Sequence, residues 1–231
     1  MPTAPDSLAD ATWPEVGVSR PALAVPVGSL EQHGPHLPLD TDTRIATAVA
    51  QALPGVAVAP AIAYGASGEH EGFDGTISLG SEALRTLVVE FGRSACRWSP
   101  RVLFVNGHGG NAPALADAVA LLRYEGRDVA WVPCAVPGAD AHAGLTETAL
   151  LLHLSSEVVR TDRCEVGDTR PIAEIMPQLR DGGVAAVSAN GVLGDPRGAD
   201  AAEGARLFEA MCARAAAAAE RWQPDTRGML R

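Results

Sequence analysis

Short apolar runs alternate along the chain with longer segments of helical spacing. The continuous apolar runs predict buried strands at residues 22–28, 56–62, 101–105 and 128–133. Apolar positions three and four residues apart predict helices at residues 43–53, 81–98, 112–125, 142–154 and 203–222. Because strands and helices alternate throughout, the pattern favours an α/β fold with a mainly parallel sheet.

Two segments lack this regular pattern. Residues 1–21 are polar, acidic and proline-containing, so we expect a flexible N-terminal segment, and residues 165–200 are expected to be rich in turns. No internal repeat or low-complexity linker divides the remainder, so residues 22–231 are predicted to form a single domain. A signal peptide and an apolar run of about 18 residues are both missing from the pattern, which predicts a cytoplasmic protein without a membrane partner.

The charge and composition exclude several classes of function. The 231-residue chain has a formal net charge of -10, whereas nucleic acids and anionic membranes need a basic surface. It contains no lysine, so Schiff-base chemistry, pyridoxal phosphate catalysis and a Walker A loop are excluded. The four cysteines are far apart and form no C-x-x-C pair, so we expect free thiols.

Polar motifs follow the predicted strands, at the edge where parallel α/β sheets carry their sites. Glu31 and His33 follow the first strand and are two positions apart, so in an extended segment they point to the same side. Asp42 begins the next predicted helix, and His108 lies among glycines in NGHGGN. In HAGLTET, Glu147 lies in the first turn of a predicted helix. We therefore expect these side chains to converge.

Together these five residues offer two imidazoles and three carboxylates, a ligand set that suits Zn, Mn or Fe(II). Three carboxylates and one hydroxide balance the charge of two divalent ions, which predicts two metal ions per subunit. Each motif alone is weak evidence for a metal site. His33 by itself is more typical of a surface or core histidine, and NGHGGN also suits a tight turn or an anion-binding loop.

Further residues near these motifs are candidates for supporting roles. We expect His36 to hold a metal ligand by hydrogen bonding, and Asn106 to hold the NGHGGN loop. Glu69 and His70 lie in YGASGEH and are predicted either to contact substrate or to have a local structural role. His153 follows Glu147 by six positions and is predicted to be structural.

The stretches VGSLEQHGPHLPLDTDTRIA, NGHGGN, HAGLTET and GVLGDP resemble the creatininase family over roughly residues 23–208. The resemblance implies a three-layer α/β sandwich, a dinuclear metal site in each subunit and hydrolysis of unusual amide C–N bonds. It also implies a homo-oligomer, since family members often form hexamers. His142 would carry a proton to the leaving amine.

Carried over position by position, the family ligands imply that Glu31 and His108 bind one metal. His33 and Glu147 would bind the other, with Asp42 bridging the two ions. One position departs from the pattern: Gly110 stands where creatininase has a glutamate ligand, and Glu147 is the expected replacement. The tryptophans that close over creatinine have no match in this chain, which argues against creatinine as the substrate.

The stretches LPLDTDTRIATAVA, PAIAYGASGEH, EALRTLVVEFGRSA and GGVAAVSANGVLGDP resemble the mycofactocin branch of the family in particular. Members of that branch release a modified C-terminal Val-Tyr-derived dipeptide from a small precursor peptide, so the resemblance implies a modified precursor peptide as substrate. Two alternatives stay open: hydrolysis of a small cyclic amide or formamide, and a metal-free binding or assembly protein on the same scaffold. A serine hydrolase is disfavoured, because Glu69 replaces the last glycine of G-x-S-x-G.

Overall fold

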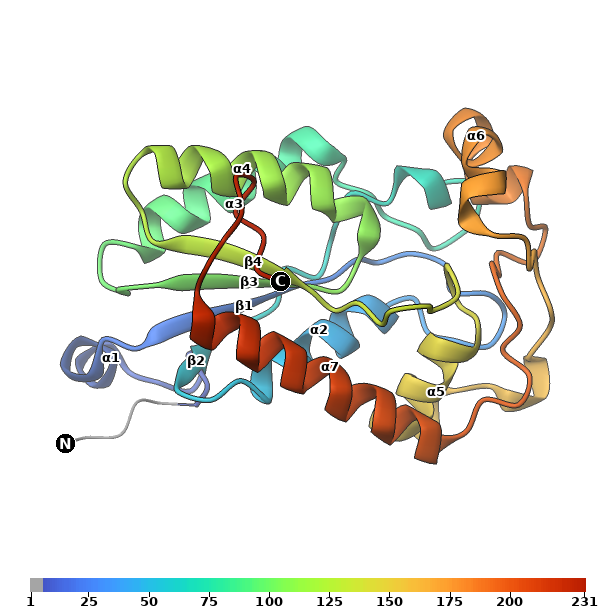
Figure 1. Cartoon of the computed structure of the whole chain (residues 1–231), viewed down its shortest axis with the longest axis horizontal. Coiled ribbons are helices and arrows are strands. Elements are labelled where there is room, and N and C mark those ends of the chain that lie inside the picture. Colours follow the sequence, from blue (N-terminus) through green and yellow to red (C-terminus); the bar gives the residue numbers. More distant parts are fainter. Residues whose placement is uncertain (1–5) are drawn as a thin grey trace.

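The computed structural model describes residues 6–231 and contains a four-stranded parallel sheet at its centre (Figure 1). The strands are β1 (Ala22–Val27), β2 (Val56–Val58), β3 (Val102–Asn106) and β4 (Val129–Pro133), in the order β2-β1-β3-β4. All neighbouring strands pair in parallel, so their carboxyl ends lie at one edge of the sheet, on the right in Figure 1. This arrangement confirms the predicted α/β fold.

Seven α-helices surround the sheet within the described range: α1 (Trp13–Ser19), α2 (Thr41–Gln51), α3 (Ser81–Ala95), α4 (Ala112–Tyr124), α5 (Leu145–Leu154), α6 (Ile172–Gly182) and α7 (Ala201–Arg221). Helices α3 and α4 cover one face, and α2, α5 and α7 cover the other, which gives the three predicted layers (Figure 1). Within residues 6–231, no helix has the length and hydrophobicity needed to cross a bilayer.

Alternation along the strands builds a separate hydrophobic core on each face of the sheet. In β3, the fully buried Phe104 packs with Leu84 and Leu115 from α3 and α4. Its neighbours Leu103 and Val105 belong to the opposite core, beneath α2, α5 and α7. Burying one such side chain contributes about 1.5–3 kcal/mol, so both faces of a strand rich in apolar residues stabilise the fold.

Helix α7 holds α5 in place by a close approach of the two helices. A Cβ at Gly204 of α7 would lie 1.9 Å from the carbonyl oxygen of Ala149 in α5, so only glycine fits at this contact. Because α5 carries Glu147 in its first turn, this contact helps to position that carboxylate relative to the sheet.

Helix α1 was not predicted by the apolar pattern. The carboxylate of Glu15 accepts hydrogen bonds from the Thr12 backbone N–H at 2.7 Å and from the Thr12 hydroxyl at 2.6 Å, which caps its first turn. The backbone N–H of Val58 in β2 also donates to the carbonyl of Asp6 at 2.9 Å. Residues 1–5 lie outside the described residues, but the rest of the expected flexible segment contains this helix and this strand contact.

Helix α6 lies within residues 165–200, which the sequence predicted to be rich in turns. Its apolar residues Ile172, Ile175, Met176 and Leu179 have helical spacing, so a signal for a helix was available, although Pro177 stands inside it and Ile175 is its single buried residue. Ile175 packs with Val184 and Leu193 in a small core separate from the two main ones. Figure 1 shows α6 beyond the carboxyl ends of the strands, which places it beside the polar motifs.

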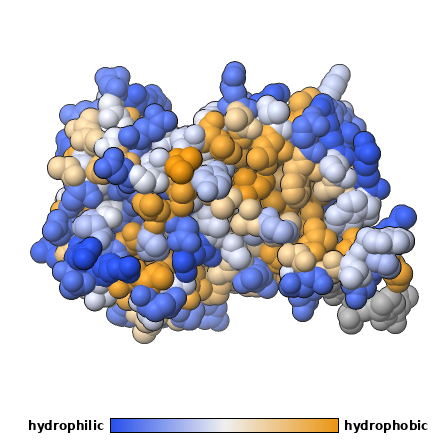
Figure 2. Space-filling view, turned by 180° about the vertical axis from the view of Figure 1, so that it is seen from behind, coloured by the Kyte–Doolittle hydropathy of each residue, from blue (hydrophilic) through white to orange (hydrophobic). Residues whose placement is uncertain are grey.

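One face of the molecule exposes hydrophobic side chains. Figure 2 shows them gathered on the face seen from behind, where α3 and the segment before it lie. Ile77, Leu79 and Leu87 are between 37% and 52% exposed. A contiguous apolar surface of this kind is typical of an interaction site rather than of a solvated face.

Two leucines of α3 provide a matched test of the core. Leu84 is fully buried, whereas Leu87 is 37% exposed. We expect Leu84→Ala to lower the free energy of unfolding by about 2–5 kcal/mol, because it leaves a cavity against β3. Leu87→Ala should cost about 1 kcal/mol or less. Urea unfolding of both variants measures the difference, and equal losses would contradict the assignment of the core.

Candidate metal centre

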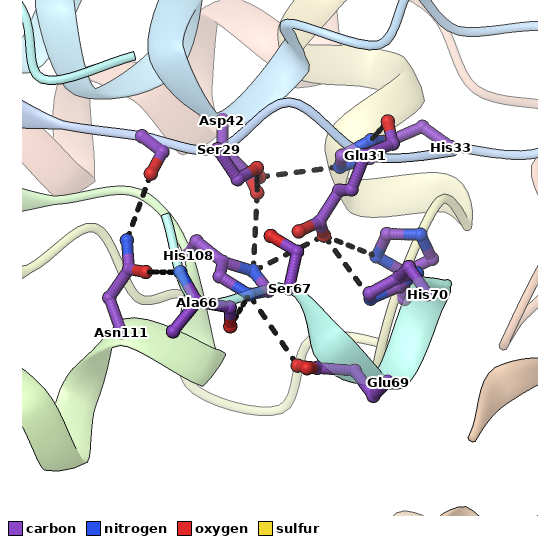
Figure 3. A network of polar contacts seen from close by, with 12 residues as sticks. Ser29, Glu31, His33, Asp42, Ala66, Ser67, Glu69, His70, His108 and Asn111 are labelled. Atoms are coloured by element: carbon purple, nitrogen blue, oxygen red, sulfur yellow. Dashed lines mark hydrogen bonds and ion pairs between the residues drawn. The ribbon is translucent and has the colours of Figure 1, made fainter. Parts of the chain in front are cut away.

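The polar motifs meet in a cavity of about 770 Å³ at the carboxyl ends of the strands. Glu31 and His33 lie in the loop after β1, and Asp42 lies in the first turn of α2. His108 follows β3, and Glu147 begins α5. All five expected ligands are therefore brought together, and Figure 3 shows Glu31 and Asp42 pointing toward His108.

The loop after β1 is folded back so that its polar side chains face inward. The Glu31 N–H donates to the carbonyl of Leu39 at 3.0 Å, which closes the loop. The Ser29 hydroxyl donates to Asp42 Oδ2 at 2.6 Å and orients that carboxylate. A Cβ at Gly107 would lie 2.3 Å from the carbonyl oxygen of Asp42, so glycine lets the loop after β3 approach the start of α2.

Glu31, Asp42 and His108 form the first candidate ligand group. His108 Nδ1 lies 3.2 Å from Glu31 Oε1 and 3.3 Å from Asp42 Oδ2. Glu31 is fully buried, and within residues 6–231 neither of its carboxylate oxygens has a hydrogen-bond partner. A buried carboxylate without donors is costly, whereas a divalent cation would satisfy both oxygens, so these residues fit a metal ion.

His33, His142 and Glu147 form the second group, which Asp42 of the first group contacts through His33. His33 Nε2 lies 3.3 Å from Asp42 Oδ1 and 3.8 Å from Glu147 Oε2. The two oxygens of Asp42 therefore face different groups: Oδ2 faces His108, and Oδ1 faces His33. This is the geometry that a bridging carboxylate requires.

Burial and charge act against each other on the groups of the site. Burial disfavours a charged His33, but Asp42, followed by Glu147 and Glu31, outweighs it and raises the pKa of His33 to about 10. Burial raises the pKa of Glu147 to about 7, although His33 opposes this shift. Burial also works against a charged Asp42, yet His33 and His108 hold its pKa well below the usual range. The carboxylates thus attract cations, and protons and metal ions compete for the site.

The outer nitrogens of two histidines are held by protein oxygens. His33 Nδ1 lies 3.2 Å from the carbonyl oxygen of Glu31. His108 Nε2 lies 3.2 Å from the carbonyl oxygen of Ala66 and 3.5 Å from Glu69 Oε1. Such partners orient the ring, so that the other nitrogen faces the centre.

The four residues expected to have supporting roles lie around this centre. His36 Nε2 is 2.8 Å from the hydroxyl of Thr148, and burial, followed by His33, lowers the pKa of His36 to about 4. His70 Nε2 lies 3.2 Å from Glu31 Oε1, and Asn106 Nδ2 donates to the carbonyl of His108 at 2.7 Å. Glu69 lies beside His108, with its Oε1 3.5 Å from His108 Nε2. His153 lies away from the site and contacts Phe208, with ring centroids 5.7 Å apart.

Gly110 leaves no room for a side chain in the loop after β3. A Cβ there would lie 2.4 Å from His108 Nε2, 2.5 Å from the carbonyl oxygen of Ala66 and 2.6 Å from Glu69 Oε1. The space beside the outer nitrogen of His108 is therefore taken by Glu69, and the carboxylate of the second group comes from Glu147 on α5.

Two further residues lie at the site: Gln32, which the sequence analysis did not consider, and Ser67, which it weighed only as the serine of an incomplete G-x-S-x-G motif. The Gln32 amide is buried and lies within 3.0 Å of ring nitrogens of His70 and His142. The Ser67 hydroxyl is fully buried and has no hydrogen-bond partner in the described range. The position of Gln32 between two expected ligands was the available signal, but two-residue alternation placed its side chain on the opposite side.

Comparison with known proteins gives a consistent picture. The family model described as creatinine amidohydrolase matches residues 9–219. The mycofactocin precursor peptide peptidase of Mycolicibacterium smegmatis is 58% identical, over 98% of this chain and 95% of its own length. A solved mutant creatininase superposes with a TM-score of 0.80 at 27% identity, over 95% of this chain and 100% of its own. Another mutant creatininase, described as of the Zn-Zn type, has a TM-score of 0.75 at 26% identity, over 95% and 99%.

Two glutamates, one buried and one exposed, test the metal centre. We expect Glu31→Gln to weaken zinc binding by at least the roughly 10- to 100-fold that outer partners of a metal site contribute, because it removes a buried anionic ligand. Glu71→Gln removes the same charge from an exposed position that lines the cavity, so it should leave zinc affinity unchanged. Isothermal titration calorimetry with zinc measures both. An equal effect of the two substitutions would refute the ligand role of Glu31.

Proposed function

Because the chain belongs to the creatininase family, we propose that it is a metal-dependent peptidase acting on a mycofactocin precursor peptide. It would hydrolyse an amide bond and release a modified C-terminal Val-Tyr-derived dipeptide. The observation that carries this proposal is the pair of ligand groups that Asp42 contacts inside a cavity open to substrate. The relative from Mycolicibacterium smegmatis supports the peptide as the substrate.

The residues present fit two divalent ions. Glu31 and His108 would hold one ion, His33 and Glu147 the other, and Asp42 would bridge them. When bound, such ions lower the pKa of water and polarise a carbonyl group. Zinc, iron and manganese all suit this ligand set, and the Zn-Zn relative supports zinc.

His142 would move the proton during hydrolysis. It lines the cavity and is 8% exposed, which leaves it accessible to a bound substrate. Burial, followed by the neighbouring His33 and His70, holds the pKa of His142 well below its usual range, so the ring is neutral in the metal-free chain. We infer that it takes a proton from the attacking water and gives it to the leaving amine nitrogen.

The cavity walls suit a peptide with an apolar end. Ile172, Met176 and Leu179 lie on one side of α6 and line the cavity opposite the metal ligands. Because these positions are spaced by four and three residues, they form one face of the helix. That face offers an apolar surface to the part of the substrate beyond the scissile bond.

Assembly and location follow from the same proposal. A homo-oligomer, with a hexamer as the form expected from the family, is supported by the hydrophobic surface seen in Figure 2. The exposure of Ile77, Leu79 and Leu87 agrees with this. A cytoplasmic location stays a prediction. The alternative substrate, a small cyclic amide or formamide, keeps the same centre and is tested below.

Incubation of the purified protein with the modified precursor peptide, followed by mass spectrometry, tests the substrate. We expect release of the C-terminal dipeptide and no turnover of creatinine or a formamidopyrimidine. His142→Ala should lower kcat by about 100- to 10,000-fold, because the leaving amine loses its proton donor. His153→Ala serves as the control. Turnover of creatinine with the peptide left intact would overturn the proposal.

The metal content of the protein tests the roles of Glu147 and Gly110. We expect about two ions per chain in the wild type and about one in Glu147→Ala, measured by elemental analysis. Adding Gly110→Glu to that variant should not restore the second ion, because a side chain at this position collides with His108 and Glu69. Restoration to two ions would show that the loop can still supply the ligand.

A further inference from the structure

The side chain of Gln32 contacts two histidines of the site at once. Its amide nitrogen Nε2 lies 2.9 Å from His70 Nδ1, 3.0 Å from His142 Nε2 and 3.0 Å from the carbonyl oxygen of Gly191. Its amide oxygen accepts the N–H of Gly34 at 2.8 Å. Gln32 is 5% exposed, so these contacts are shielded from water.

Two backbone groups determine the orientation of this amide. The N–H of Gly34 can only donate, and the carbonyl of Gly191 can only accept. A flipped amide would therefore place two donors 2.8 Å apart and two acceptors 3.0 Å apart. The nitrogen of Gln32 must face the two histidines.

The protonation of His142 follows from a second contact. His142 Nε2 lies 2.8 Å from the backbone carbonyl oxygen of Gln32, which can only accept, so Nε2 carries the hydrogen. A ring N–H cannot also accept from the Gln32 amide, so the 3.0 Å approach of Gln32 Nε2 to His142 Nε2 is a contact between two donors and not a hydrogen bond. This is one mismatch, whereas the flipped amide would create two. The two amide hydrogens are therefore left for Gly191 and for His70 Nδ1.

The same tautomer then has opposite consequences in the two rings. His70 accepts at Nδ1, so its hydrogen is on Nε2, which faces Glu31 Oε1 at 3.2 Å. His142 also carries its hydrogen on Nε2, but its bare Nδ1 faces the centre, 3.9 Å from Glu31 Oε1.

We propose that Gln32 is a positioning residue. Its side-chain amide fixes the hydrogen of His70 on Nε2, which faces Glu31 Oε1, and its backbone carbonyl fixes the hydrogen of His142 on Nε2, which leaves Nδ1 free as an acceptor. Glu31, His70 and His142 have the spacing of a further metal site, but the N–H that His70 presents excludes it as a ligand through Nε2. Of the two rings, His142 alone offers a lone pair toward the centre. The catalytic use of that lone pair rests on the proposed function.

Gly191 helps to hold the Gln32 amide in place. Its φ is +79°, and a Cβ there would lie 1.9 Å from Gln32 Oε1. Any side chain at position 191 would displace the Gln32 amide, so Gly191→Ala disturbs Gln32 without changing its chemistry. This provides an independent route to the same test.

Two-bond ¹H–¹⁵N correlation spectra report the tautomers directly. They are recorded on the full-length protein with ¹⁵N-labelled histidine, once without metal and once loaded with zinc. We expect His70 and His142 to carry hydrogen on Nε2 in the wild type. In Gln32→Glu, the carboxylate presents only acceptors, so His70 should gain a proton on Nδ1. Gln51→Glu makes the same change at the exposed end of α2 and should leave both signals unchanged.

A wild-type spectrum with hydrogen on Nδ1 of His70 would overturn the proposal without any variant. So would a folded Gln32→Glu protein whose His70 and His142 signals match the wild type. If Gln32→Glu does not fold, Gln32→Met and Gly191→Ala are measured in the same way, and both should lose the uniform Nε2–H form of His70. None of these readouts needs a substrate, so they stand apart from a failure of the proposed function.

Activity gives the last readout. We expect kcat of Gln32→Met to fall about 10- to 100-fold, as for other residues that orient a functional histidine, with zinc content unchanged. A loss of zinc in parallel with kcat would indicate a purely structural role for Gln32. Unchanged kcat together with the expected tautomers would limit its role to His70 and Glu31.

Discussion

The burial of Glu31 beside Asp42 is the constraint on which the rest of this centre depends. Two carboxylates removed from water repel each other and lose their hydration, so the folded chain must supply positive charge at their oxygens. In the metal-free chain, His33 and His108 do so, and their contacts at 3.2–3.3 Å follow from that demand. The loops around the centre, from the Ser29 contact to the close approach at Gly107, hold the carboxylates where such charges can reach them.

The elements of the fold follow from the apolar pattern because each strand is buried on both faces and each main helix packs on the sheet. Helix α6 was missed although its apolar residues have helical spacing, because it contains Pro177 and packs on a small core of its own rather than on the sheet. The convergence of Glu31, His33 and Asp42 could be anticipated from strand topology. Their division into two groups could not, because it depends on how the loop after β1 folds back through the Glu31–Leu39 hydrogen bond.

Local periodicity could not predict the direction of the Gln32 side chain. Alternation holds in a strand, but this residue lies in a loop whose path is set by distant segments, among them Gly191. The departure at Gly110 has a similar cause. Glu69, from the 3-10 helix Gly68–His70, takes the space that a side chain at 110 would need, and the carboxylate ligand is instead available from α5. The likeness to creatininases covers the scaffold.

The small core of Ile175, Val184 and Leu193 has an evolutionary consequence. Because these residues pack apart from the two main cores, mutations that reshape α6 are buffered from the stability of the sheet. They are not buffered from the site, because Leu193 of this core pairs with His142 through two backbone hydrogen bonds. Evolution can thus change the outer wall of the cavity through one peripheral helix without unfolding the sheet, provided that the backbone pairing at His142 is kept.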